Sequence, residues 1–222
     1  MMKIIDLTHT LTPSIPTWDG NCGFHLKTNH DYIEDQEQIT FKVQSMSLNC
    51  GIGTHVDAPA HCFSSLQSIE QLPLESLINP GILIDISHRS DANNFLHSDD
   101  IFNFESIYGQ IPENSCVLIH TGWEQHWPTP KYHNNYQFPY ISAEAATLLV
   151  TRNIKALGID TLSPDRPDSG FPVHGLLLSK QILIIENIAN LNLLPPTNFM
   201  VTIAPLKIKD ATESPVRMWA TL

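Results

Sequence analysis

The segment His55-Val56-Asp57-Ala58-Pro59-Ala60-His61 places two imidazoles and a carboxylate within one short stretch of chain. Histidine nitrogen and aspartate oxygen are ligands that Zn²⁺ and Mn²⁺ prefer. Pro59 excludes a helix interior, so we expect residues 55 and 57 to lie on a short extended piece with both side chains on one face. His61 is expected to return after a turn. The segment therefore predicts a divalent metal site that is not the helical H-E-x-x-H type.

The whole chain has the composition of a globular protein. Its 222 residues are 42% hydrophobic and 16% charged, which suits one domain spanning residues 1–222 with a core that needs no staples. No apolar run reaches the roughly 18 to 20 residues of a membrane span, and the first residues lack the apolar run of a signal peptide. Four scattered cysteines without a C-x-x-C pair favour reduced thiols. We therefore expect a soluble, cytoplasmic protein.

The net charge of −11 argues against a nucleic-acid partner, because a phosphate backbone would be repelled. Twelve Lys and Arg residues are spread too thinly along the chain for a basic patch. A small molecule is the expected partner.

Runs rich in β-branched residues predict strands at 82–86, 117–119, 182–185 and 201–204. Helical patterns follow the candidate N-caps Ser98 and Ser142, and we expect helices at 99–107, 143–153 and, more briefly, 174–180. Strands come first and then alternate with helices. This order favours an α/β or α+β fold whose sheet is partly buried on both faces.

Two further residues draw attention because of their surroundings. Glu186 interrupts the apolar run of a predicted core strand, and burying a lone carboxylate costs several kcal/mol unless it is protonated, paired or bound to a metal. A strand-end glutamate that reaches water or an arginine is the alternative. His174 stands where a helix begins, and a lone histidine at such a position is more often structural. With His55, Asp57 and His61, these residues supply enough groups for one or two metal ions and a proton-transfer group.

The segment from Gly53 to His61 resembles the signature H-x-G-T-H-x-D-x-P-x-H of the metal-dependent cyclase or kynurenine formamidase-like hydrolase family. The resemblance continues through most of the chain, in Asp6-Leu7-Thr8-His9, Pro16-Thr17-Trp18, Leu157-Gly158-Ile159-Asp160-Thr161 and Pro215-Val216-Arg217. It implies a swivelling β/β/α, cyclase-like fold, assembled as a homodimer or tetramer.

The resemblance also implies roles for individual residues. His55, Asp57 and Glu186 would bind metal, with both carboxylates able to bridge two ions, and His174 would complete the second site. The metal would be zinc, as one or two ions, with manganese as the alternative. His61 would donate and accept protons. Trp18 would lie against an aromatic substrate. Taken alone, Trp18 is better explained by core packing, but its place in a loop between Pro16 and Asp19 makes the two interpretations even.

The sequence departs from the family signature at its first histidine, whose place is held by Gly51. In an extended segment Cys50 would point away from the site, so a replacement ligand from Cys50 needs an irregular backbone. A distant histidine such as His25, His30 or His120 is the other candidate. Without a replacement, the first metal site lacks one ligand, which leaves either one well-held metal or two with water in the gap.

The function implied is a metal-dependent hydrolase of a small, aromatic amide or cyclic amide or ester, similar to the arylformamidases of tryptophan catabolism. Metal-activated water would attack the carbonyl, with His61 as general acid and base. A thiol enzyme with Cys62 as nucleophile, activated by a histidine, is a second interpretation. It is weaker because adjacent residues on an extended chain face opposite ways, which places His61 badly for activating Cys62. A catalytically silent binding or structural protein is a third reading, made plausible by Gly51.

Overall fold

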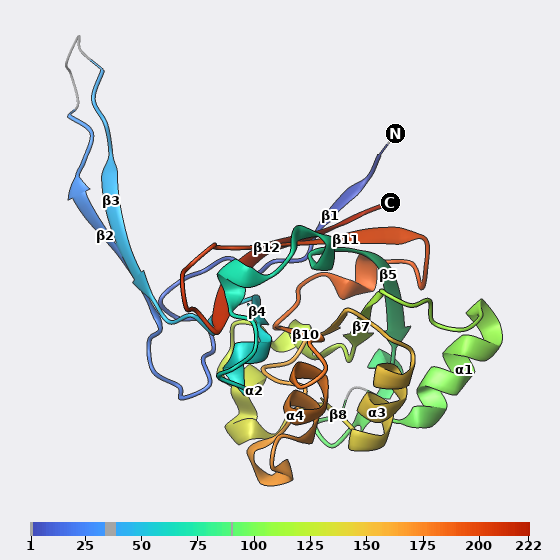
Figure 1. Cartoon of the computed structure of the whole chain (residues 1–222). Coiled ribbons are helices and arrows are strands. Elements are labelled where there is room, and N and C mark those ends of the chain that lie inside the picture. Colours follow the sequence, from blue (N-terminus) through green and yellow to red (C-terminus); the bar gives the residue numbers. More distant parts are fainter. Residues whose placement is uncertain (1, 34–38, 90) are drawn as a thin grey trace.

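A computed structural model describes residues 2–33, 39–89 and 91–222 of the chain. Its main sheet has eight strands, and β4 pairs with both β10 and β12, so that the sheet closes into a barrel (Figure 1). The strands β5, β7, β9 and β10 run parallel to one another, and the remaining pairs are antiparallel. In spatial order they are β1 (Ile4–Asp6), β12 (Glu213–Thr221), β11 (Phe199–Pro205), β5 (Ile78–Asp85), β7 (Cys116–His120), β9 (Ala156–Ile159), β10 (Leu183–Glu186) and β4 (His55–Asp57).

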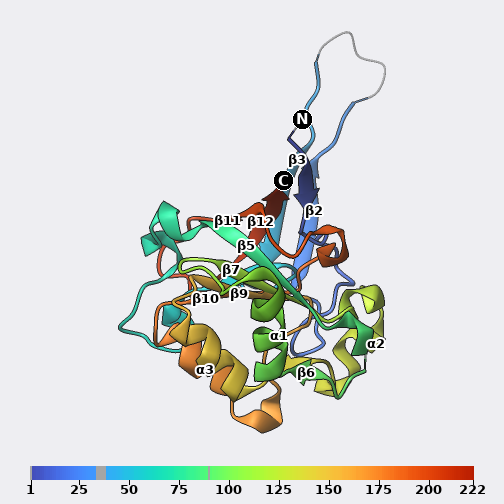
Figure 2. The same ribbon diagram turned by 90° about the vertical axis from the view of Figure 1, so that its right-hand side faces the viewer.

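Helices connect the parallel strands and lie together on one side of the sheet (Figures 1 and 2). They are α1 (Ser98–Tyr108), α3 (Ala143–Thr151) and α4 (Pro172–Leu178), with a single turn α2 (Pro130–His133) after β7. Short 3₁₀ turns span Pro59–His61, Ile69–Gln71, Leu74–Ser76, Ser87–Arg89, Trp123–His126, Asn134–Tyr136, Pro167–Ser169 and Leu191–Leu193. Among the described residues, no helix has both the length and the apolarity to cross a bilayer.

The period of two along the strands separates two apolar cores. On β5, Ile82 and Ile84 pack with the helices, where they meet Ile101 of α1. Leu83 points to the opposite face and packs inside the barrel with Met218 of β12. Both faces of the parallel strands are buried, one in the barrel core and the other against the helices. Their sequences are therefore continuous apolar runs, which made strands predictable there.

The four predicted strands are all present, and three helices lie where helices were expected. Ser142 caps α3 as predicted, by accepting a hydrogen bond from the Ala145 backbone N–H at 3.1 Å. At α1 the prediction was one residue late, because His97 holds the N-cap position and Ser98 is the first helical residue. The prediction for α4 started two residues late for a similar reason, since Pro172 suits the first turn. The mixed α/β class is confirmed.

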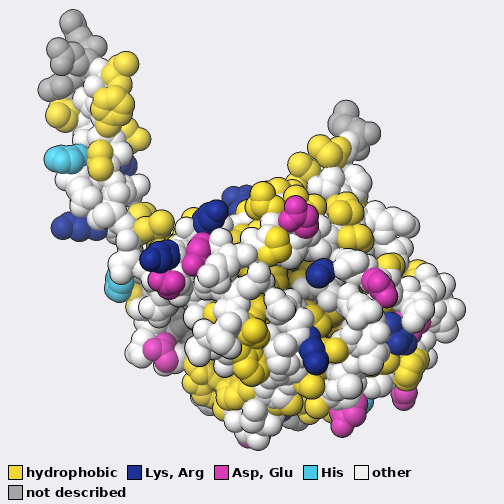
Figure 3. Space-filling view, in the orientation of Figure 1, with side chains coloured by type: hydrophobic (Ala, Val, Ile, Leu, Met, Phe, Trp, Pro, Cys, Tyr) yellow, Lys and Arg dark blue, Asp and Glu magenta, His cyan; other side chains and the backbone are white. Residues whose placement is uncertain are grey.

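A hairpin of β2 (Phe24–His30) and β3 (Val43–Leu48) projects away from the body of the molecule (Figures 1 and 3). The hairpin carries exposed apolar side chains on both strands, at Leu26, Val43 and Met46. A small parallel pair, β6 (Phe95–Leu96) with β8 (Tyr140–Ile141), lies apart from the main sheet. The sequence patterns did not predict this hairpin.

The packing of β9 predicts an unequal response to two glycine substitutions. A Cβ atom at Gly158 would lie 2.5 Å from Ile188 Cδ1 and 2.6 Å from Leu118 Cδ2, both fully buried, so Gly158→Ala should lower the free energy of unfolding by about 1–3 kcal/mol. Gly175→Ala is the control, because no heavy atom lies within 4 Å of its added Cβ and alanine favours the helix by up to about 1 kcal/mol. Urea denaturation measures both, and equal effects would contradict this packing.

Candidate metal centre and its pocket

The pairing of β4 with its two neighbours builds the candidate site. In the β4–β10 register His55 lies opposite Glu186, and in the β4–β12 register Asp57 lies opposite Glu213. Residues opposite one another on antiparallel strands share a face of the sheet. Val56 points the other way, into the barrel core. Three strands therefore place one imidazole and three carboxylates on a single face, as the extended reading of residues 55–57 predicted for His55 and Asp57.

His55 is held in one orientation by its own loop. Its Nδ1 donates to the Gly53 carbonyl oxygen at 2.8 Å, which leaves Nε2 facing the acidic groups. Nε2 lies 3.3 Å from Glu186 Oε2 and 3.6 Å from Asp57 Oδ1. A histidine that donates one ring N–H to a carbonyl and turns the other nitrogen into an acidic pocket has the arrangement of a metal ligand.

His174 approaches the same carboxylates from α4. Its Nδ1 donates to Asp165 Oδ2 at 2.8 Å, and Asp165 also accepts the backbone N–H groups of Val173 and His174 at the start of the helix. His174 Nε2 lies 3.6 Å from Asp57 Oδ2 and 3.6 Å from Glu186 Oε1. Each of the two carboxylates thus turns one oxygen to His55 and the other to His174, which is the geometry of a bridging carboxylate.

Buried carboxylates give the site a strong preference for positive charge. Burial by itself lowers the pKa of both histidines, but hydrogen bonds and the charges of Asp57 and Glu186 outweigh it. The pKa of His55 rises to about 9 and that of His174 to about 11. Asp57 Oδ1 is buried without a hydrogen-bond partner. The donor set and this unpartnered oxygen fit a divalent cation.

His61 ends the 3₁₀ turn Pro59–His61 and lies at the rim of the site. Its side chain is 34% exposed, against 5% for His55 and 8% for His174. The contact of its Nδ1 with Glu213 Oε2 at 3.5 Å raises the pKa of His61, against the effect of burial. His61 also forms one of two potential metal-binding triads around Asp57: Asp57–His61–His174 and His55–Asp57–Glu213, each with donor atoms within 4.8 Å of one another.

The site opens into a cavity of about 460 Å³ that all six residues predicted from the sequence line: Trp18, His55, Asp57, His61, His174 and Glu186. Its outer wall is apolar and includes Trp18, Leu162 and Phe171. Trp18 is 36% exposed and lines the cavity, so it is not part of the core. Its carbonyl oxygen accepts a hydrogen bond from the Tyr136 hydroxyl at 2.7 Å, which fixes the loop that carries it.

Sequence reasoning missed three residues of the site, Asp165, Phe171 and Glu213. Glu213 stands two residues before the Pro215-Val216-Arg217 segment, but only the register of β12 with β4 brings it to Asp57. The only sequence signal for Asp165 was that an acidic residue precedes the start of α4.

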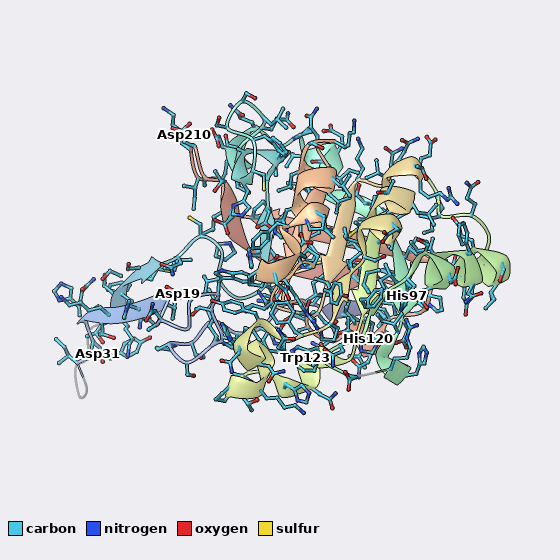
Figure 4. All side chains as sticks on the ribbon, turned by 90° about the horizontal axis from the view of Figure 1, so that it is seen from below. Asp19, Asp31, His97, His120, Trp123 and Asp210 are labelled. Atoms are coloured by element: carbon cyan, nitrogen blue, oxygen red, sulfur yellow. The ribbon has the colours of Figure 1, made fainter. Side chains whose placement is uncertain are left out.

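The candidate replacements for the missing histidine at position 51 do not line the cavity. Cys50 is exposed, and His25 and His30 lie on the projecting hairpin. His120, labelled in Figure 4, ends β7, and its Nδ1 lies 3.1 Å from Asp85 Oδ1. Arg217, from the Pro215-Val216-Arg217 segment, pairs with Asp6.

A family model named Cyclase, with the description "Putative cyclase", matches residues 5–166. The chain belongs to the cyclase family. This match confirms the family resemblance that the sequence segments suggested. Kynurenine formamidase of Salinibacter ruber is 25% identical over 217 residues, covering 97% of this chain and 96% of the relative.

Solved structures of other cyclase-family folds superpose on the whole chain. Isatin hydrolase A from Labrenzia aggregata, bound to benzyl benzoate, has a TM-score of 0.88 at 29% identity, covering 100% of this chain and 94% of that one. A protein described as a predicted metal-dependent hydrolase from Bacillus stearothermophilus has a TM-score of 0.80 at 25% identity, covering 100% and 98%. The expected cyclase-like fold is confirmed.

The role of Asp165 in this cyclase-family site predicts the effect of a nearly isosteric change. Asp165→Asn removes the negative charge that holds the His174 ring by its Nδ1–H, and the NH₂ end of the amide must oppose an N–H group of Val173 or His174, so the ring is oriented less strongly towards a cation. We expect the affinity for Zn²⁺ to fall by about 10- to 100-fold with the fold retained. Competition with a zinc dye measures the affinity, and an unchanged value would contradict this account of His174.

Proposed function

We propose that this cyclase-family protein is a metal-dependent hydrolase that cleaves a non-peptide C–N bond in a small aromatic amide or cyclic amide, with a cyclic ester as the related alternative. The observation that carries the proposal is the convergence of two imidazole Nε2 atoms on the two shared carboxylates of Asp57 and Glu186. The likeness to a kynurenine formamidase and to an isatin hydrolase supports the same class of reaction.

In this proposal His55, Asp57, His174 and Glu186 hold the metal, as one or two zinc ions, with manganese as the alternative. A divalent metal supplies Lewis acidity, which lowers the pKa of water towards 7 and polarises a carbonyl group. Glu186 lies within a strand of buried residues, and its burial raises the pKa of its carboxyl group, so a bound cation would favour its ionised form.

His61 is the proposed proton carrier. It lies at the cavity rim, more exposed than the other two histidines, and its Nδ1 is oriented by Glu213 Oε2. That contact leaves Nε2 free to take a proton from the attacking water and to return it to the leaving nitrogen. Because an imidazole changes charge near neutral pH, one residue can perform both transfers.

The apolar wall of the cavity supports an aromatic substrate. Trp18 and Phe171 face each other with ring centroids 6.0 Å apart, tilted by 53°. A cavity of about 460 Å³ suits one small molecule. We propose that Trp18 lies against the aromatic ring while the scissile carbonyl points to the metal centre.

We further propose that residues 1–222 act as one unit, as a cytoplasmic homodimer or tetramer. Site residues come from β4, α4, β10 and β12, so no smaller segment carries the site. The hairpin of β2 and β3 supports an oligomer, since its exposed apolar side chains stand clear of the body of the molecule (Figure 3).

The thiol alternative is poorly supported. Cys62 lines the cavity, but burial raises the pKa of its thiol, which disfavours the reactive thiolate. The other alternative is a binding or structural protein without catalytic activity, and activity assays distinguish it from an enzyme.

Metal removal tests the proposed function. Treatment with a chelator should abolish hydrolysis, and added Zn²⁺ or Mn²⁺ should restore it, in assays on formylkynurenine, isatin-like lactams and simple aryl formamides. Cys62→Ser should retain activity and lose it again on chelation. Full activity after verified metal loss would overturn the proposal, and bound metal without turnover of any of these compounds would favour the silent binding protein.

His61→Ala separates proton transfer from metal binding. We expect turnover to fall by about 10²- to 10⁴-fold, because the general acid and base is lost, while the metal content stays the same. Elemental analysis of the same preparation gives the second readout. Loss of metal from this variant would make His61 a ligand, which the Asp57–His61–His174 triad allows, and the assignment would be wrong.

A further inference from the structure

Gly51 and Glu213 occupy complementary positions beside His55. A Cβ atom built on Gly51 would lie 2.1 Å from Glu213 Oε1 and 3.5 Å from His55 Nε2. The carboxylate of Glu213 therefore fills the space that any side chain at position 51 would enter. That space adjoins the ring nitrogen that His55 presents to the metal centre.

Glu213 is placed there by the sheet and not by a flexible loop. It is the first residue of β12 and lies opposite Asp57 in the register that closes the barrel. Donor atoms of His55, Asp57 and Glu213 all lie within 4.8 Å of one another. One nitrogen and two carboxylate oxygens at this spacing form a possible three-ligand set.

A second observation points to a cation between these groups. Asp57 Oδ1, the oxygen on the His55 side, has no hydrogen-bond partner although Asp57 is only 1% exposed. Among the described residues that line the cavity, none is lysine or arginine, so apart from the titratable imidazoles no cationic side chain faces Asp57, Glu186 and Glu213. An unpartnered buried carboxylate oxygen is costly unless a cation binds it.

We propose that Glu213 Oε1 is a metal ligand that replaces the histidine missing at position 51, so that the site at His55 and Asp57 is complete. This inference rests on the proposed metal-dependent function. Oε2 of the same carboxylate contacts His61 Nδ1 at 3.5 Å, so Glu213 would join the metal centre to the proton carrier. In this proposal the ligand comes from Glu213 of β12, which pairs with β4, instead of from position 51 in the loop before β4.

The test is a reciprocal exchange measured by metal binding. Zn²⁺ affinity and stoichiometry are measured on the purified full chain for the wild type, Glu213→Ala, Glu213→Gln, Gly51→His and the double variant Gly51→His/Glu213→Ala. We expect Glu213→Ala to lose one equivalent of zinc or to bind it about 10- to 100-fold more weakly. Glu213→Gln should weaken binding less, because an amide oxygen remains. The double variant should recover affinity, because a histidine then enters the vacated space.

Gly51→His alone should gain less affinity than the same change gains in the Glu213→Ala background, since Glu213 Oε1 occupies the space that the new side chain enters. Glu75→Ala, at an exposed position, is the matched control and should bind zinc like the wild type. Thermal unfolding of the metal-free proteins checks the fold, and visible spectra of the Co²⁺-loaded wild type and Glu213→Gln give a second readout if the double variant does not fold. A changed Co²⁺ spectrum in Glu213→Gln supports ligation, and an identical one contradicts it.

Two results would overturn the inference in distinguishable ways. If the wild type and Glu213→Ala bind zinc equally well, Glu213 is not a ligand, and the proposed function is unaffected. If that variant also loses turnover, Glu213 acts only by positioning His61. A wild type that binds no divalent metal overturns both the inference and the proposed function.

Discussion

The pairing of β4 with two neighbours is the constraint on which the rest of the structure depends. Three residues, His55 to Asp57, bond to β10 on one side and to β12 on the other, and this closes the barrel. Because side chains alternate along a strand, the same three residues send Val56 into the core and turn their two polar side chains to the cavity. If the register of β4 shifted by one residue, Val56 would turn to the cavity and the polar side chains would turn into the core.

Charge explains why so many polar groups are tolerated at this closure. The carboxylates of Asp57 and Glu186 are buried against two imidazoles whose pKa values rise to about 9 and about 11. A divalent cation held by the proposed ligands would neutralise the same carboxylates as the protons on these rings, so the two would compete for the site. Asp165 and the Gly53 carbonyl select the ring nitrogen that faces the centre. In this proposal the stability of the barrel closure and the affinity for metal are linked.

Local patterns were enough to predict the extended piece at 55–57, the Ser142 cap and three of the four parallel strands, β5, β7 and β10, because strands buried on both faces have continuous apolar runs. Glu186 was recognised because a charge interrupts such a run. Glu213 was not, because its contact with Asp57 depends on a long-range register that no local period encodes. Strand β9 was not among the predicted strands, since it is short and contains Gly158. Gly51 looked like a defect from sequence alone, and Glu213 gives it a physical explanation.

The central claim is that a divalent metal binds between the histidines and carboxylates gathered by β4. An anomalous difference map at the zinc edge, from crystals grown with Zn²⁺, tests this claim most directly. The account predicts at least one strong peak within coordination distance of His55 Nε2 or His174 Nε2 and of a carboxylate oxygen of Asp57. A map with no peak between these residues, or with zinc bound only elsewhere on the protein, would contradict it.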